Sequence, residues 1–271
     1  MSKLKQQFGD WALITGASSG IGEEFAKQIA AAGVNVVLVA RRLERLKTLA
    51  DTLESEYHVR TLIVEQDLAE EDSVRNIAEI TADLDVRLII SNAGDGAMGG
   101  FLKQDVNKFS SAIKLNVLNP VKMAHHFLGK LYLAQKPGGL LFVSSGVSVA
   151  GAPYISDYSA SKAYQSNLGQ ALHHELKPFG IHVTVLMPGP TKTEAYDRED
   201  IDFSKMPMPP MSATRVVKLG LRGLIKNKPV VVPGMMNKMM DFMARRVMSR
   251  KMASKMFGIL MKGLIAPQYR Y

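Results

Sequence analysis

The 271-residue sequence contains no cysteine. Disulfide bonds and thiolate metal sites are therefore excluded, and this absence fits a chain that works in a reducing cytoplasm. No run of 18 apolar residues occurs, so we expect no membrane-spanning helix. The first ten residues hold no apolar stretch and lead directly into a glycine-rich motif, which leaves no room for a signal peptide. We expect a cytoplasmic protein.

Acidic residues are nearly absent from the C-terminal quarter of the chain. Residues 205–271 hold 14 Lys and Arg but one acidic residue, Asp241, which gives this part a charge of +13. Residues 1–204 hold 20 Lys and Arg and 24 Asp and Glu, a charge of −4, so the net charge of +9 arises in the C-terminal part. Since this basic part has few aromatic residues and no recognised nucleic-acid motif, we expect no nucleic-acid partner.

Apolar runs alternate with helical patterns along most of the chain. The runs predict strands at 11–14, 34–40, 62–64, 86–91, 140–144, 181–186 and 230–232. Helices are expected at 23–32, 43–53, 73–81, 117–133, 158–176 and 213–225, and a loop at 194–212. Such alternation favours an α/β fold, with one doubly wound parallel sheet of Rossmann type and helices on both faces. We expect residues 1–233 to form one dinucleotide-binding and catalytic domain, and residues 234–271 a helical extension that is not an independent domain.

A glycine-rich motif follows the first expected strand and begins the first helix. It reads Thr15-Gly16-Ala17-Ser18-Ser19-Gly20-Ile21-Gly22. Glycine permits a tight turn there and lets the backbone approach a pyrophosphate at the helix N-terminus. The spacing G-x-x-x-G-x-G differs from the commoner G-x-G-x-x-G, and a glycine turn without a ligand is the alternative. We expect the cofactor to contact Gly16, Ser18, Ser19, Gly20, Ile21 and Gly22.

Two arginines follow Ala40, which stands where NAD-binding folds place an acidic residue. An acidic group would repel a 2′-phosphate, whereas the guanidinium of Arg41 or Arg42 binds it bidentately. Both arginines precede a helix, and the helix dipole disfavours cations at its N-terminus. Two arginines there make sense if they bind an anion such as the 2′-phosphate. We therefore expect NADP(H) rather than NAD(H), with a solvated basic turn as the alternative. Asp67, with Leu68 beside it, is placed for the adenine side, although a helix N-cap would also explain it.

Tyr158 and Lys162 lie four residues apart and share one face of an expected helix. A free phenol has a pKa of about 10, which makes it a poor proton donor near neutrality. An ammonium about 4 Å away contributes up to ~4 kcal/mol at an effective dielectric of 20, which would lower the pKa of the phenol. Such a tyrosine can protonate a carbonyl oxygen, and Ser145, at a strand end, can bond the same oxygen. An ordinary surface pair is the alternative for Tyr-x-x-x-Lys alone.

Over about residues 9–233 the chain resembles the short-chain dehydrogenase/reductase family. The resemblance rests on 15–22, Asn92-Ala93-Gly94, Asn116, Ser145, Tyr158-x-x-x-Lys162 and Pro188-Gly189-Pro190-Thr191-Lys192-Thr193. It implies that Tyr158 is the acid/base, that Ser145 orients the substrate oxygen, and that Lys162 also holds the nicotinamide ribose. It implies that Asn116 supports a water-linked proton relay to Lys162.

The same resemblance extends to the rest of the cofactor site. It implies that Asn92, Ala93 and Gly94 line the adenosine side and that Pro188, Gly189, Thr191 and Thr193 hold the nicotinamide carboxamide. Arg41-Arg42 looks like the NADP-preferring branch of the family. Asp95-Gly96 lies near the expected substrate position, as a turn pair or as a substrate contact.

Paired histidines at 125–126 and 173–174 fall on two expected helices. Neighbours on a helix point apart and no HExxH spacing occurs, so we expect no metal site. In the resembling family these two helices form subunit contacts, which implies packing or interface roles for the histidines and a homodimer or homotetramer.

Methionine is concentrated near the C-terminus, with 12 of the 16 between residues 206 and 261. Met236, Met240 and Met243 fall near helical spacing, and Lys238 and Arg245 take another face. We expect the segment 235–271 to be a flap on the body or a subunit interface, with contact to an anionic membrane surface as the second interpretation. Flexible methionines also suit an adaptable apolar pocket.

The expected activity is that of an NADPH-dependent oxidoreductase. Hydride transfer to a ketone or aldehyde, reversible as oxidation of an alcohol, is the leading hypothesis, with an apolar substrate. The alternative is an NADP(H)-binding scaffold or sensor whose basic tail engages a membrane or a protein partner.

Overall fold

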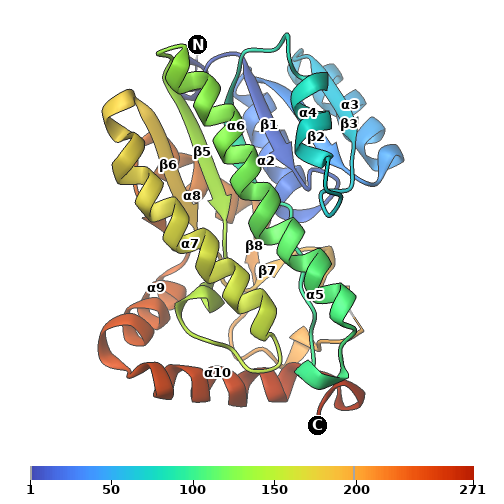
Figure 1. Ribbon diagram of the computed structural model, residues 1–271, viewed down its shortest axis with the longest axis vertical. Helices are drawn as coiled ribbons and strands as arrows, with labels where there is room; N and C mark the ends of the chain where they lie inside the picture. The colour runs from blue at the N-terminus through green and yellow to red at the C-terminus, as the bar shows by residue number, and fades with distance from the viewer. Residues whose placement is uncertain (1, 198) are drawn as a thin grey trace.

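The computed structural model describes residues 2–197 and 199–271. In this part of the chain, seven parallel strands form the central sheet in the order β3-β2-β1-β4-β5-β6-β9 (Figure 1). The strands are β1 Trp11–Thr15, β2 Asn35–Ala40, β3 Thr61–Glu65, β4 Val86–Ser91, β5 Gly138–Val143, β6 Ile181–Leu186 and β9 Val230–Val231. The order reverses between β1 and β4, and ligands of such sheets bind outside the carboxyl ends of the strands at this point. The expected doubly wound sheet is confirmed.

Helices cover both faces of the sheet, as the alternation of apolar runs predicts. One face carries α2 Gly20–Ala31, α3 Leu43–Tyr57 and α8 Ala213–Ile225, and the other carries α4 Ser73–Ile80, α6 Asn119–Leu133 and α7 Ser156–Leu176. Successive strand side chains point to opposite faces, so Ile14 packs in the first layer and Leu13 in the second. Because both faces are buried, each strand is apolar almost throughout.

The chain before α6 is more helical than its pattern predicts. Helix α5 spans Val106–Ile113, and its N-cap is Asp105, whose side chain accepts from the Asn107 amide at 2.9 Å. A π-helical turn, Lys114–Leu118, joins it to α6. A further short helix, α1 at Lys3–Phe8, packs Leu4 and Phe8 into the core.

The segment between β6 and α8 is anchored at both ends. Strand β7, Thr191–Lys192, pairs in parallel with β8, Met211–Ser212, and Ile201 forms a bridge with Ile265. The expected loop therefore contains short ordered pieces, including turns of 3-10 helix at Glu194–Asp197 and Phe203–Lys205.

The C-terminal extension is helical but interrupted. Helix α9, Met235–Phe242, runs into a π-helical turn, Met243–Val247, and α10, Arg250–Leu264, starts afresh with the Ser249 side chain capping Met252 at 3.2 Å. Helix α10 crosses below the end of the sheet to which β5 points (Figure 1). No helix in the described residues has the length and hydropathy needed to cross a membrane.

Candidate active site

A cavity of about 670 Å³ lies at the carboxyl ends of the central strands. This volume is in the range of sites for small molecules and cofactors. One half is walled by the glycine motif and by the segments that follow β2, β3 and β4. The other half is walled by the 201–208 segment and by α9 and α10, and it is mostly apolar. The first half is the candidate cofactor site and the second the candidate substrate site.

The glycine motif forms a close turn at the start of α2. Gly16 has φ +68° and Gly20 has φ +58°, a left-handed backbone that favours glycine. A Cβ on Gly22 would lie 2.1 Å from the Gly16 carbonyl oxygen, so this glycine lets the helix approach the turn. Gly16, Ser18, Ser19, Gly20 and Ile21 line the cavity, whereas Gly22 is packed behind it.

Asn92 holds the segment after β4 against that turn. Its Nδ2 donates to the Thr15 carbonyl oxygen at 2.9 Å, and Thr15 Oγ1 accepts from the amides of Asn92 and Ala93 at 2.9 and 3.0 Å. Asn92, Ala93 and Gly94 all line the cavity. The backbone amides at the start of α2 and the side-chain-free glycines of the turn fit the pyrophosphate of a dinucleotide.

Arg42 uses each side of its guanidinium at the cavity wall. Nε donates to Ser18 Oγ at 3.1 Å, NH2 donates to Ser19 Oγ at 2.7 Å, and NH1 lies 2.9 and 2.8 Å from the two carboxylate oxygens of Glu194. Arg45 NH1 also lies 2.9 Å from this carboxylate. Hydrogen bonding to Arg42 lowers the pKa of Glu194. No local pattern in the sequence indicates this carboxylate, which lies 152 positions from Arg42.

Arg41 extends from the same turn, and its NH1 lies 3.6 Å from Asp67 Oδ2. Asp67 Oδ1 accepts from the Ala69 amide at 2.8 Å, so Asp67 stabilises its own turn. It does not cap α4, whose N-cap position is Asp72, and the N-cap alternative is therefore wrong. Arg41, Asp67 and Leu68 all line the cavity.

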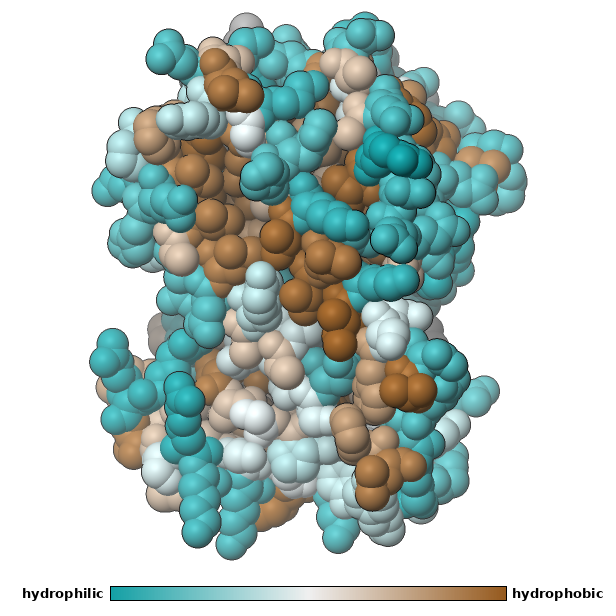
Figure 2. Space-filling model, viewed as in Figure 1, coloured by the Kyte–Doolittle hydropathy of each residue, from teal (hydrophilic) through white to brown (hydrophobic). Residues whose placement is uncertain are grey.

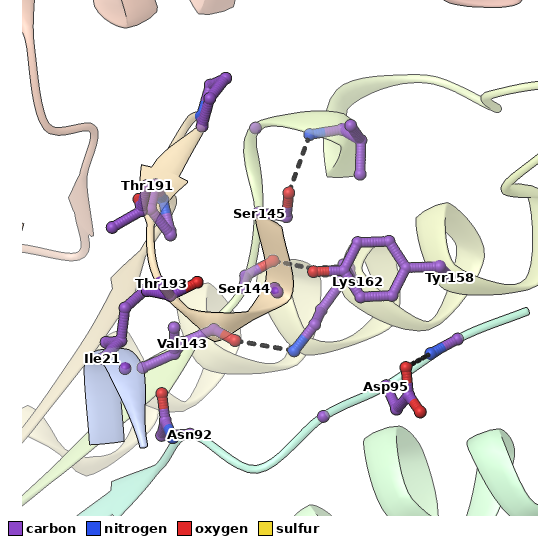
Figure 3. A pocket seen from close by; sticks show the side chains of 18 of the residues that line it. Ile21, Asn92, Asp95, Val143, Ser144, Ser145, Tyr158, Lys162, Thr191 and Thr193 are labelled. Carbon is purple, nitrogen blue, oxygen red and sulfur yellow. Dashed lines mark hydrogen bonds between the residues drawn. The ribbon is translucent and has the colours of Figure 1, made fainter. Parts of the chain in front are cut away.

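Lys162 is buried at the centre of the site, with 3% of its surface exposed. Its Nζ donates to the Val143 carbonyl oxygen at 2.8 Å and lies 5.7 Å from the centroid of the Tyr158 ring (Figure 3). Nζ also donates to Gln165 Oε1 at 3.1 Å. Burial lowers the pKa of Lys162 to about 8, so the group remains mostly protonated at pH 7. The two side chains share one face of α7, as the spacing predicts.

Ser145 follows β5 on an extended backbone and lines the same cavity as Tyr158 and Lys162. Its Oγ accepts weakly from the Val147 amide at 3.4 Å, which leaves the hydroxyl hydrogen to donate elsewhere. The preceding residue differs, because Ser144 is buried and donates to the Lys162 carbonyl oxygen at 2.8 Å. Ser144 thus supports α7 while Ser145 faces the cavity.

Asn116 lies in the π-helical turn, fully buried and behind the cavity wall. Its side chain accepts from the Asp95 amide at 3.1 Å and donates to the Asp95 carbonyl oxygen and to Ser161 Oγ. Its backbone carbonyl oxygen accepts from Gln165 Nε2 at 2.7 Å. The Gln165 side chain thus connects the Asn116 backbone to Lys162. The water-linked relay between Asn116 and Lys162 that the resemblance implies stays a prediction.

Gln165 is a residue that sequence reasoning missed. It lies three positions after Lys162, so the helical spacing placed both on one face of α7. Nothing in the sequence indicated that its other end would reach Asn116, which is 49 positions away.

Two glycines let the chain after β4 pass over the reacting residues. A Cβ on Gly94 would lie 2.9 Å from Lys162 Nζ, and one on Gly96 would lie 2.7 Å from Tyr158 Cβ. Asp95 Oδ1 accepts from the Gly96 amide at 2.8 Å, and both residues line the cavity. The backbone at 95–96 forms no turn, so the turn-pair interpretation is wrong, and a substrate contact of Asp95 stays a prediction.

The extension walls the cavity. Helix α9 lies on the Pro188-Gly189 turn so closely that a Cβ on Gly189 would be 2.4 Å from Asn237 Oδ1. The apolar lining comes from Ile201, Phe203, Met206, Met208, Met240, Met256, Phe257, Leu260 and Met261. Pro188, Gly189, Thr191 and Thr193 line the cavity between this apolar half and the glycine motif.

The paired histidines do not line the cavity. His173 is buried, and its Nδ1 lies 2.8 Å from the Val183 carbonyl oxygen. Burial lowers the pKa of His126. His173 therefore packs inside the protein, whereas its neighbour His174 and also His125 are exposed.

Comparisons with known proteins agree on the family. A family model described as short chain dehydrogenase matches residues 10–202. A 7beta-hydroxysteroid dehydrogenase of Collinsella aerofaciens is 32% identical over 190 residues, covering 70% of this chain and 72% of that protein. A solved structure from work on 7beta-hydroxysteroid dehydrogenase stereoselectivity superimposes with a TM-score of 0.86 at 26% identity, covering 95% of this chain and 99% of the other. A short-chain dehydrogenase of Sphingobium yanoikuyae in complex with NADPH gives 0.79 at 32% identity, covering 83% and 88%.

The chain therefore belongs to the short-chain dehydrogenase/reductase family. It is an oxidoreductase of the class that interconverts CH–OH and C=O groups, and its family binds nicotinamide cofactors. The expected family and enzyme class are confirmed.

Proposed function

We propose that this protein is an NADPH-dependent reductase of ketones or aldehydes, which also oxidises the corresponding alcohols. The observation that carries the proposal is the position of three side chains. Ser145, Tyr158 and Lys162 line one cavity, in which Tyr158 packs against the apolar core that includes Phe257 and Met261, while Lys162 lies beside Gly94 of the segment after β4. A carbonyl group held in the apolar half would meet them there.

Each side chain has a separate part in this reaction. The bound nicotinamide supplies the hydride. Tyr158 Oη gives a proton to the carbonyl oxygen, and Ser145 Oγ donates a hydrogen bond that orients it. The Lys162 ammonium, buried beside the phenol ring, favours the ionised phenol that remains after proton transfer. Asn116 supports Lys162 through Gln165.

Replacement of the proton donor tests the mechanism. Tyr158→Phe should keep cofactor binding but lose most of kcat, by about 10²–10⁴-fold, the range for a general acid. Tyr164→Phe is the matched control, since Tyr164 lies exposed on the same helix. Wild-type rates in Tyr158→Phe would refute the mechanism.

Preference for NADP(H) is supported by charge. Arg41 and Arg42 follow β2 and line the cavity with Ser18, to which Arg42 donates, and a dinucleotide on the glycine motif would have its 2′-hydroxyl or 2′-phosphate near the end of this strand. The solved relative at 32% identity is in complex with NADPH. Arg41→Ala should weaken NADPH far more than NADH, and equal weakening would count against a phosphate site.

An apolar substrate is supported by the lining of the second half. Methionine, phenylalanine and leucine side chains from two segments surround it, and flexible methionines adapt to different shapes. Because relatives are named as 7beta-hydroxysteroid dehydrogenases, we infer a bulky apolar carbonyl of steroid-like or lipid-derived type. A panel of carbonyl compounds, followed by loss of NADPH absorbance, tests this; turnover restricted to small polar carbonyls would refute it.

Pairing of two copies through α6 and α7 is supported by their outer surface. Both helices lie in front of the sheet in Figure 1, and Figure 2 shows apolar side chains gathered along the middle of that face. Several large apolar or aromatic side chains are exposed there, with 42–82% of their surface accessible. They are Leu118 just before α6, Tyr132 and Leu133 in α6, and Tyr164 in α7. We infer a homodimer or homotetramer, and sedimentation of the wild type as a monomer would refute it.

The basic extension supports a second role. Met235, Met239 and Phe242 expose more than half of their surfaces, and residues 235–271 hold eight Lys and Arg against one Asp. Such a surface fits anionic lipid, and we infer a cytoplasmic protein with peripheral membrane contact. Cosedimentation with anionic but not neutral vesicles, lost in Phe242→Asp, would support this.

A scaffold without catalysis is disfavoured, because a binding protein does not need Ser145, Tyr158 and Lys162 together.

A further inference from the structure

We infer that Glu194 is a cofactor-specificity residue, because its carboxylate competes with a 2′-phosphate for Arg42. The inference rests on the proposed function, in which Arg41 and Arg42 receive that phosphate. It concerns a residue of the segment after β7, not of the glycine motif or of the turn after β2.

The Glu194 carboxylate is held by several donors at once. Arg42 NH1 contacts both of its oxygens at 2.9 and 2.8 Å, and Arg45 NH1 contacts one of them at 2.9 Å. Ser19 also hydrogen-bonds to it, and these contacts lower its pKa, so Glu194 is ionised at neutral pH. Guanidinium and hydroxyl donors that converge in this way form the kind of site that recognises phosphate.

Arg42 has little capacity left for a second anion. Its Nε and NH2 donate to Ser18 and Ser19, and its NH1 faces Glu194. A phosphate oxygen that approaches Arg42 must replace one of these partners, and Glu194 is the anionic one among them. If Glu194 stays, a carboxylate and a phosphate dianion share one guanidinium and repel each other.

The conflict exists for only one of the two nicotinamide cofactors. NAD(H) carries a 2′-hydroxyl, which can donate a hydrogen bond to a carboxylate. NADP(H) carries a phosphate, which cannot do so when it is fully ionised. Glu194 should therefore weaken the NADP preference that Arg41 and Arg42 would otherwise give, and leave NAD(H) binding unchanged or slightly favoured.

The test compares two nucleotides that differ by the phosphate alone. Calorimetry would measure binding of 2′,5′-ADP and 5′-AMP to the wild type, to Glu194→Gln and to Glu44→Gln. Glu44 is the matched control, because its carboxylate lies in the first turn of α3 but contacts Lys47 rather than Arg42. We expect Glu194→Gln to bind 2′,5′-ADP about 2- to 5-fold more tightly, the range for a partly exposed ion pair, with no gain for 5′-AMP. Glu44→Gln should resemble the wild type.

Three results would overturn the inference. These are an unchanged or weaker affinity of Glu194→Gln for 2′,5′-ADP, an equal gain for both nucleotides, and the same gain in Glu44→Gln. Arg42→Ala separates this outcome from failure of the proposed cofactor. If the wild type does not prefer 2′,5′-ADP over 5′-AMP and Arg42→Ala changes neither affinity, the phosphate site itself is refuted. If the preference exists and Glu194→Gln has no effect, only the inference about Glu194 fails.

Discussion

Lys162 should make the stability of this protein depend on pH in a distinctive way. Burial lowers the pKa of Lys162 from 10.5 to about 8. The unfolded chain therefore binds one more proton than the folded protein between pH 8 and 10.5. Since stability rises with pH wherever the unfolded state binds more protons, the contribution of Lys162 increases by about 1.4 kcal/mol for each pH unit in this window. Below pH 8 both states are protonated, and folding carries a constant cost of about 3 kcal/mol.

The change that isolates this effect is Lys162→Met, which keeps the length of the side chain and removes the charge. At any single pH, the free energy of unfolding of this variant reflects both the removed charge and the lost hydrogen bonds, because the Val143 carbonyl oxygen and Gln165 lose a partner at a cost of about 1–3 kcal/mol. The change in stability with pH reflects the removed charge alone. From pH 7 to pH 10 we expect the wild type to gain about 2–3 kcal/mol relative to the variant.

Urea unfolding, followed by circular dichroism at pH 7, 8, 9 and 10, measures this difference. Lys177→Met is the control, because Lys177 lies exposed just beyond the same helix, and its curve should run parallel to the wild type. If the Lys162→Met curve is also parallel to the wild type from pH 7 to pH 10, the lysine does not carry the burial cost assigned to it.

Two further changes concern the surroundings of the reacting residues. Gln165→Leu removes an acceptor from the Lys162 ammonium, so the alkaline limb of kcat/KM should move to lower pH by about one unit; an equal loss at every pH would contradict this. Gly96→Ala puts a methyl group 2.7 Å from Tyr158 Cβ and should reduce kcat up to about 100-fold by misplacing the phenol. Gly129→Ala, which meets no atom within 4 Å, should leave kcat unchanged; equal kcat in the two alanine variants would refute the argument.

The parts of the fold that the sequence predicted are those that local rules determine. Strand β2 reads Asn-Val-Val-Leu-Val-Ala because it is buried on both faces, and a continuous apolar run records this directly. The glycine motif predicts its turn because Gly16 and Gly20 take a left-handed backbone that other residues avoid. Tyr158 and Lys162 share a helix face through their spacing alone.

The parts that escaped prediction depend on contacts between distant segments. Glu194 meets Arg42 only because the chain after β7 folds back over the turn after β2. Asn116 lies in a π-helical turn, and a pattern with the period of an α-helix does not reveal the inserted residue. In the extension, the helical spacing of the methionines continues across Met248 and Ser249, although the backbone is extended at these two residues. The break between α9 and α10 therefore could not be predicted from the spacing.

The reacting residues and the apolar wall of the cavity are carried by different helices. Substitutions in the wall should therefore affect substrate binding more than proton transfer. Tyr158 and Lys162 are carried by α7, a helix packed on the sheet, whereas Met256 and Leu260 reach the cavity from α10. Helix α10 contacts the body mainly through a small core that it shares with Ile155, and the Tyr158 ring and Met256 both pack against this core. A change in that wall should alter how the substrate is held and leave the proton donor in place. Met256→Ala should therefore raise or lower KM for bulky carbonyls by several-fold while the pH dependence of kcat/KM stays at its wild-type position. Steady-state kinetics at several pH values would measure both, and a shifted alkaline limb would show that the extension also tunes Lys162.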